Sequence, residues 1–219
     1  MMAPPGPTFP PSRLAAVWRH WLRPFVLVAL AVFAFRSAVL DWNVVPTGSM
    51  RPTIVEGDYI LVNKVAYDVR LPFTGWRLLP SGEPERGDIV IFEPPGSEDR
   101  YVKRVIGLPG DVVALRGNRI HVNGRPAGYE VPGTEVLTGH AHGVLLPPGW
   151  SPGDDLPPVV VPEGHYFVLG DNRGNSKDSR VFGFVPRTRI LGKATRVVVS
   201  LDPLHTWKPR PGRLFQPLA

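Results

Sequence analysis

The chain has 219 residues, a net charge of +6 and no cysteine, which excludes disulfide bonds, thiolate nucleophiles and cysteine-ligated metals. Its length allows a buried core in one or two domains, and its 27 prolines and 23 glycines favour short strands and turns over long helices. The positive charge fits a protein that works near anionic lipid or near nucleic acid, and it does not decide between them.

The first 42 residues divide into a tail and a predicted membrane anchor. Residues 1–13 are rich in proline, offer little apolar surface to bury and are predicted to be a disordered tail. Residues 14–42 form a basic flank followed by an apolar run, 24–40, in which Arg36 is the only charge. The run is shorter than the roughly 20 apolar residues that a span needs, but an arginine near its end can extend its charged group to the interface. We therefore expect a single transmembrane helix.

The charges around this run predict its orientation. Arginines precede the run, so the positive-inside rule places the N-terminus in the cytoplasm and everything after Trp42 outside the cell membrane. The alternative is a cleaved signal peptide, which has the same basic-then-apolar pattern. The small residues Ala29 and Ala31 fall inside the apolar run, and Arg36 occupies the region where a cleavage site belongs. The pattern therefore favours an anchor that is retained.

After residue 42 the sequence changes to a period of two and to short apolar runs bounded by glycine, proline, aspartate or asparagine. Such runs are typical of β-strands. The predicted strands are 58–67, 87–92, 101–107, 110–115, 119–123, 165–170 and 191–200. No helical pattern of comparable length follows the anchor. The sequence therefore predicts a mainly β fold behind one N-terminal transmembrane helix.

A smaller insertion is predicted within this β-rich region. Residues 115–127 have the pattern of a hairpin, with turns at Gly117-Asn118 and Asn123-Gly124. Residues 128–162 are rich in proline and poor in strand formers, so we expect loops there. Ser151 matches a G-x-S-x-G pattern, but it lacks the preceding strand and following helix that this motif needs, and we interpret it as a loop residue. The expected order is a first β part (43–111), a variable β and loop insertion (112–161), a second β part (162–202) and a basic C-terminal tail (203–219).

Ser49 is the first candidate for chemistry. It follows Gly48, which allows a close backbone approach or a strained turn, and it lies between two stiffening prolines, Pro46 and Pro52. By itself such a segment is most often a solvated turn. A serine becomes a nucleophile only when a neighbouring base takes its proton. Of the six histidines, His20 precedes the span and His140 and His142 lie in the loop-rich region. The other three have no acidic residue in an arrangement that suggests a triad, although folding could bring a partner close.

Lys103 is the alternative base. The strand period places Tyr101 and Lys103 on one face of 101–107 and Arg104 on the other, and both faces are mostly apolar. Desolvation would lower the pKa of the amine, and a drop of about three units would cost roughly 4 kcal/mol of folding stability. A chain tolerates that cost mainly where the neutral amine is used. The other interpretation, which this segment alone favours, is an edge-strand lysine whose charged end reaches water.

A third segment, 169–186, alternates acidic and basic residues among glycines. The charged residues are Asp171, Arg173, Asp178 and Arg180. They could form a rigid loop of ion pairs, and Ser176 or Ser179 could hydrogen-bond a neutral amine. The alternatives are a solvated turn with weak surface pairs and a carboxylate metal site. Arginines beside the aspartates disfavour the metal, so no metal site is expected.

These segments together resemble the bacterial type I signal peptidases, also called leader peptidases. The matching boxes are PTGSMRPTI (46–54), GDIVIF (87–92), RYVKRVIGLPGD (100–111) and GDNRGNSKDSRVFGFVP (170–186). Four boxes in this order behind one N-terminal span are specific, and the resemblance covers residues 44 to about 202. It implies a mainly β catalytic domain with a smaller, variable β insertion.

The resemblance also implies roles for individual residues. Ser49 would be the nucleophile and Lys103 its general base, and the Ser49 N–H and the Thr47 hydroxyl would form the oxyanion hole. Many members have serine at the Thr47 position, and Gly174 departs from an acidic residue common in the family. The implied supporting residues are Met50 beside the serine, Ser176 orienting the amine, Tyr101 and Gly170 walling off the lysine, and Arg104, Asp171, Asp178 and Arg180 holding the architecture.

The implied function is that of a membrane-anchored serine endopeptidase that removes signal peptides from exported pre-proteins through an acyl-enzyme, without metal or organic cofactor. Expected partners are signal-peptide-bearing pre-proteins and membrane lipid, with no nucleic acid, and a monomer is expected. Two rivals remain open. A self-cleaving repressor-type protein could share the serine–lysine pair, but it would carry a DNA-binding segment in place of the anchor. A membrane-tethered β module with a binding role would tolerate the loss of Ser49 or Lys103.

Overall fold

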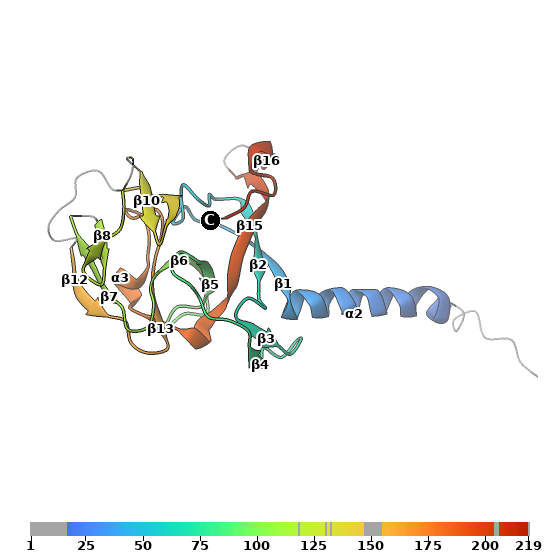
Figure 1. Ribbon diagram of the computed structural model, residues 1–219. Coiled ribbons are helices and arrows are strands. Elements are labelled where there is room, and N and C mark those ends of the chain that lie inside the picture. Colours follow the sequence, from blue (N-terminus) through green and yellow to red (C-terminus); the bar gives the residue numbers. More distant parts are fainter. Residues whose placement is uncertain are drawn as a thin grey trace, which may run out of the picture.

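The computed structural model describes residues 17–117, 119–129, 131, 133–146, 155–203 and 206–218. The predicted disordered tail (1–13) and the loop interpretation of Ser151 lie outside these residues. The fold is mainly β, with one long N-terminal helix that projects from the β-rich body (Figure 1), as the sequence predicted.

The N-terminal helix consists of a π-helical turn, Trp18–Leu22, and α2, Arg23–Ala38. Pro24 lies at the start of α2, directly after the π-helical turn. The combined helix, Trp18–Ala38, is 21 residues long, apolar enough to cross a membrane and almost entirely exposed. An apolar helix that is hydrophobic all round and exposed outside the protein is typical of a membrane span.

The principal sheet has eight strands in the order β1-β2-β15-β5-β6-β13-β14, with β16 paired to β15. Its strands are β1 (Leu40–Val44), β2 (Asp58–Asn63), β5 (Ile89–Phe92), β6 (Tyr101–Gly107), β13 (His165–Leu169), β14 (Val185–Pro186), β15 (Ile190–Asp202) and β16 (Lys208–Pro209). All of these pairings are antiparallel. In β2 alternate residues are buried, which is the period of two that predicted a strand there.

The remaining strands form three smaller units. A four-stranded sheet has the order β12-β7-β8-β9, and two hairpins pair β10 with β11 and β3 with β4. The bounds are β3 (Asp68–Arg70), β4 (Arg77–Pro80), β7 (Val112–Arg116), β8 (Arg119–Val122), β9 (Arg125–Pro126), β10 (Thr134–Leu137), β11 (His140–Gly143) and β12 (Leu156–Val160). Between β8 and β9, Asn123 and Gly124 both have positive φ, as the predicted two-residue turn requires. Short helices cover Ser179–Phe182 (α3), Arg187–Arg189 and Pro211–Arg213.

Two segments differ from expectation. The region 128–162 was predicted to be loops, yet it contains β10, β11 and β12. The sequence pattern did not predict β12 because this strand contains two prolines. Its extended form comes from its pairing with β7. Similarly, the expected C-terminal tail folds back onto β15 over residues 206–218. Arg213 there pairs with the fully buried Asp58 at 2.6 Å.

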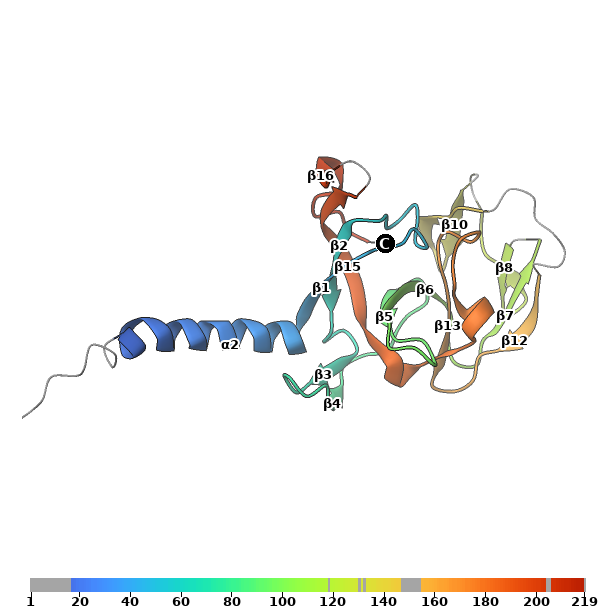
Figure 2. The same ribbon diagram turned by 180° about the vertical axis from the view of Figure 1, so that it is seen from behind.

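The helix and the insertion lie at opposite ends of the molecule. In Figure 1 and in the reverse view of Figure 2, α2 leaves the body beside β1, while β7, β8 and β12 lie at the far end. The hairpin β3-β4 and the strand β16 flank the end from which α2 projects in both views. The principal sheet therefore lies between the helix and the insertion and connects them.

Candidate active site

Ser49 lies in the loop that joins β1 to β2, eleven residues after the last residue of the helix, Ala38. Two apolar side chains of this loop, Met50 and Ile54, are fully buried in the core and fix its course. The loop is also held by Asn172, whose N–H donates to the Ser49 carbonyl (3.1 Å) and whose Nδ2 donates to the Gly48 carbonyl (3.0 Å). The serine is thereby held in a fixed position with 9% of its surface exposed.

Lys103 lies on β6, which pairs with β5 on one side and β13 on the other, so it is not on an edge strand. Its Nζ is 2.7 Å from Ser49 Oγ and 2.9 Å from the Val102 carbonyl oxygen. Only 3% of the residue is exposed, which confirms the expected desolvation. Burial lowers the pKa of the amine to about 8, although the negative charges of Asp178 and Asp171 oppose this shift.

Arg104 points to the opposite face of β6 and forms a buried ion pair with Asp171. Its Nε and Nη2 atoms each lie 2.9 Å from the carboxylate, a bidentate geometry. The Thr53 hydroxyl donates to the same carboxylate at 2.5 Å. Because Thr53 belongs to the serine loop, this pair joins that loop to β6 and to the segment after β13.

Asp178 holds the segment after β13 from the other side. Its carboxylate accepts the Gly170 N–H at 3.0 Å and two hydrogen bonds from the Arg180 guanidinium, each 2.8 Å. It also caps α3 by accepting the Arg180 N–H. A Cβ on Gly170 would collide with Ser176 Oγ and with the Ser49 carbonyl oxygen. Glycine at this position therefore allows Ser176 and the serine loop to pack closely against the end of β13.

Some expected site residues lie elsewhere than the resemblance implied. Met50 is packed in the hydrophobic core and does not line the cleft beside Ser49. The Ser176 hydroxyl is buried and makes no hydrogen bond within the described part of the chain, and therefore none to the Lys103 amine. Tyr101 does lie near the amine, with 5.5 Å from Nζ to its ring centroid. Thr47 lines the cleft and is exposed.

Ser49 and Lys103 open onto a cleft of about 450 Å³. Its walls come from the serine loop, the start of β6 and the segment after β13; they include Val45, Pro46, Thr47, Tyr101, Val102 and Asn175. A cleft of this size admits a few residues of an extended peptide. Within the described residues, no group of three or more acidic or histidine side chains is placed to hold a metal ion.

A second buried ionic group, which sequence reasoning missed, supports the site from the insertion. Glu135 on β10 is fully buried and accepts two hydrogen bonds from Arg173, at 2.7 and 2.9 Å. Arg173 Nε in turn donates to the Gly170 carbonyl at 3.1 Å. Asn172, beside it, was also missed, although it lies inside the late box. The sequence gives no signal for Glu135, because its partner is 38 residues away.

Comparison with known proteins identifies the family. Residues 18–199 match the family model described as "Signal peptidase, peptidase S26". The chain belongs to this signal peptidase family. Signal peptidase I of Pseudomonas aeruginosa is 38% identical over 200 residues, which cover 80% of this chain and 70% of that protein. The probable signal peptidase I-2 of Synechocystis is 33% identical over 183 residues, covering 81% and 71%.

A solved signal peptidase I from Enterococcus faecalis is 32% identical, with a TM-score of 0.36, and covers 51% of this chain and 96% of that one. The family match confirms the resemblance to type I signal peptidases. The chain is therefore a peptidase of the class that removes signal peptides. The family match therefore argues against the alternative of a self-cleaving repressor-type protein.

Proposed function

We propose that this signal peptidase is a membrane-anchored serine endopeptidase that cleaves exported pre-proteins with Ser49 as nucleophile and Lys103 as general base. The observation that carries the proposal is the 2.7 Å contact between Lys103 Nζ and Ser49 Oγ. With a pKa of about 8, a useful fraction of the buried amine is neutral near neutral pH and can accept the serine proton.

Acylation then follows from the positions of these groups. As Ser49 Oγ attacks the carbonyl carbon of the scissile bond, its proton passes to Lys103 Nζ. The oxyanion forms beside the Ser49 N–H, which donates to no other group in the described part of the chain, and beside Thr47. The Lys103 ammonium then protonates the leaving amine, which departs as the N-terminus of the mature protein.

Deacylation uses the same amine. A water molecule loses a proton to Lys103 as its oxygen attacks the acyl-enzyme carbonyl, and that proton returns to Ser49 Oγ when the ester breaks. The nearby charges of Asp178 and Asp171 favour the ammonium that forms in each half-reaction. Ser176 keeps its proposed role as a positioning residue, since its buried hydroxyl has no partner within the described residues and lies against Gly170.

The proposed substrate is a signal peptide where it leaves the bilayer. The serine loop follows the helix directly through β1, a five-residue strand, so a membrane-spanning α2 keeps the cleft close to the outer surface. An extended segment with small residues before the cut would lie in the cleft against β6. The N-terminus would be cytoplasmic and the β-rich body extracytoplasmic.

The test is cleavage of a purified pre-protein in detergent by the wild type and by Ser49→Ala, Lys103→Ala and the exposed control Lys208→Ala. Product termini are read by mass spectrometry and folding by circular dichroism. We expect both site variants to stay folded and to lose at least about a thousandfold in rate, because the two groups act as a unit. Wild-type cutting by either site variant would show that the assigned pair is wrong.

A further inference from the structure

The cleft at Ser49 changes in character from one end to the other. At the start of β6 its walls are mainly apolar and include the side chains of Val45 and Val102. A smaller pocket of about 60 Å³ adjoins this apolar end. The wall formed by the segment after β13 is polar instead, and its residues are Asn175 and Lys177. The cleft therefore offers different chemistry to the two halves of a bound peptide.

Lys177 is an exposed cation in this polar wall. Its side chain makes no hydrogen bond or ion pair with any residue that the structure describes. The backbone on both sides of it is fixed, because the Ser176 hydroxyl is buried and the fully buried Asp178 caps α3. Since both neighbours point into the body, Lys177 points outward to the cleft that it lines.

Two further charged residues line the cleft just before β6, and both are held by their own surroundings. Arg100 donates to Asn43 Oδ1 at 3.2 Å and lies 3.6 Å from the Asp41 carboxylate. Asp99 accepts a hydrogen bond from the Ser97 hydroxyl at 3.2 Å. These two side chains are therefore less available to a ligand than the amine on the opposite wall.

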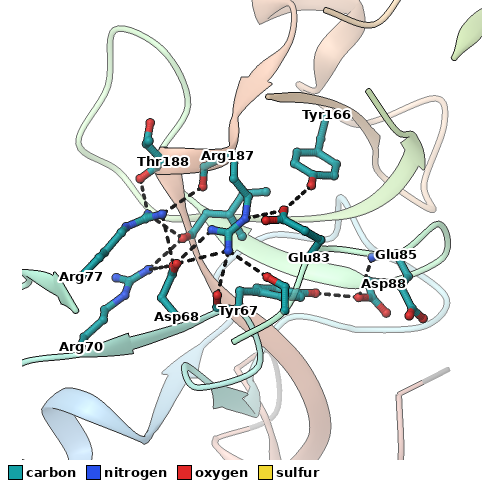
Figure 3. Close-up of polar contacts among 12 residues, drawn as sticks. Tyr67, Asp68, Arg70, Arg77, Glu83, Glu85, Asp88, Tyr166, Arg187 and Thr188 are labelled. Atoms are coloured by element: carbon teal, nitrogen blue, oxygen red, sulfur yellow. Dashed lines mark hydrogen bonds and ion pairs between the residues drawn. The ribbon is translucent and has the colours of Figure 1, made fainter. Parts of the chain in front are cut away.

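Other cations of the body are neutralised by acidic residues of the same chain. Figure 3 shows such a group at the base of the hairpin β3-β4, where three arginines reach the Asp68 carboxylate. Arg70 lies 3.3 Å from it, and Arg77 and Arg187 each lie 3.1 Å away. Lys177 has no such partner among the described residues, so an acidic group of a bound peptide can take that place.

The position of Lys103 indicates which half of a substrate meets Lys177. In the proposed mechanism the Lys103 ammonium protonates the leaving nitrogen, which belongs to the first residue of the mature protein. This amine lies close enough to the segment after β13 for the charges of Asp178 and Asp171 to act on it. The mature residues therefore leave along the polar wall, and the small residues before the cut occupy the apolar end.

We propose that Lys177 determines specificity on the mature side of the cut, because its ammonium binds an acidic side chain at the first or second residue of the mature protein. The inference rests on the proposed function and deepens it. Successive side chains of an extended peptide point to opposite faces, so one of these two residues is turned toward the lysine. An exposed ion pair is weak, and the expected preference in kcat/KM is roughly two- to fivefold and decreases with added salt.

Matched peptides test this preference in detergent. They share one signal-peptide end and differ only at the first or the second mature residue, which is glutamate, glutamine or lysine. The enzymes are the wild type, Lys177→Glu, Lys177→Gln and Lys208→Glu, an exposed control that changes the net charge as Lys177→Glu does. Each enzyme is described by the ratio of its kcat/KM values on the glutamate and lysine peptides, so that a general loss of activity cancels.

We expect the wild type and Lys208→Glu to favour glutamate at one of the two positions. Lys177→Gln should cleave both peptides equally, and Lys177→Glu should favour lysine. A wild type without preference at either position would overturn the proposal, as would a wild-type ratio in both Lys177 variants. An equal shift in Lys208→Glu would also overturn it, because the preference would then follow net charge and not the residue in the cleft.

Ser49→Ala separates this inference from the proposed function. If Ser49→Ala still cleaves the glutamine peptide at the wild-type rate, the assigned nucleophile is wrong and the inference fails with it. If Ser49→Ala is inactive and both Lys177 variants keep the wild-type ratio, the serine–lysine pair stands and only the assignment of Lys177 is wrong.

Discussion

At the scale of single residues, the proposed chemistry depends on the buried amine of Lys103. Burial disfavours the ammonium and lowers the pKa to about 8, against the opposing charges of Asp178 and Asp171. An exposed lysine would be almost wholly protonated at neutral pH and could not accept the proton of Ser49. The position of Lys103 on a central strand therefore matters as much as its distance from the serine.

The pH dependence of cleavage should report this pKa. In the proposed mechanism the neutral amine is the active form, so kcat/KM should rise with pH, reach half its maximum at about pH 8 and level off above. The measurement is the initial rate on a short peptide in detergent across pH 6 to 10. A half-maximum near 10.5, the ordinary value for lysine, would mean that the base is not a desolvated amine.

The same burial carries a cost in stability. The folded pKa of about 8 lies below the ordinary 10.5, so the cost is fully present below pH 8 and is relieved as the pH rises toward 10.5. Lys103→Met removes a cost of up to about 3 kcal/mol. We expect an inactive variant with a free energy of unfolding at pH 7 that is about 1–3 kcal/mol higher, since a hydrogen bond to Ser49 is also lost. Urea unfolding, with Lys208→Met as control, measures it; a less stable variant would contradict the prediction.

At the scale of elements, the hairpin β10-β11 links the insertion to the segment after β13, beside Ser49. Burial raises the pKa of Glu135, but its contacts with His142, Arg173 and Tyr129 outweigh burial and lower the pKa to about 2. Through Arg173 the carboxylate holds the Gly170 carbonyl, next to Ser49. The insertion is thus part of the support of the site.

Glu135→Gln should destabilise the protein by about 3–5 kcal/mol at pH 7, because the buried Arg173 guanidinium loses its counter-charge. The stabilisation from Glu135 is present above its ordinary pKa of 4.5 and is lost as the pH falls toward 2. Urea unfolding at several pH values should therefore show a weaker acid dependence in the variant. Exposed Glu163→Gln is the matched control, and equal stability of the two variants would contradict the role of the pair.

At the scale of the whole molecule, one continuous path runs from α2 through β1 to the Ser49 loop. Asp41 on β1 pairs with Arg36 in the last turns of the helix at 2.8 Å and with Lys64 at 3.2 Å. The helix is therefore joined to the sheet by contacts as well as by the chain. If the helix spans a membrane as proposed, this coupling makes its orientation there determine where the cleft lies.

The orientation can be measured with single cysteines in intact cells. A membrane-impermeant maleimide should label Gly96→Cys, in an exposed turn of the body, and should label Thr8→Cys only after the membrane is opened. This expectation follows from the proposed topology, in which the basic residues before the apolar run stay in the cytoplasm. Labelling of Thr8→Cys in intact cells would reverse the topology and contradict the proposed access to exported pre-proteins.

The sequence by itself determined the features that depend on the pattern of neighbouring residues. The apolar helix, most strands of the principal sheet and the Asn123-Gly124 turn follow from periodicity and from residues that permit positive φ. The four boxes likewise indicated the family, because each box is a short contiguous run. These features depend on neighbours within a few residues, which a single sequence displays directly.

Only the tertiary structure decided the features that depend on distant partners. Ser49 and Lys103 are 54 residues apart and meet because the sheet order places β6 beside the serine loop. The burial of Met50, the pairing of Glu135 with Arg173 and the return of the C-terminal segment to Asp58 depend on partners 38 to 155 residues away or on the packing of the whole core. Such contacts are fixed by the joint burial of many segments, and no local pattern encodes them.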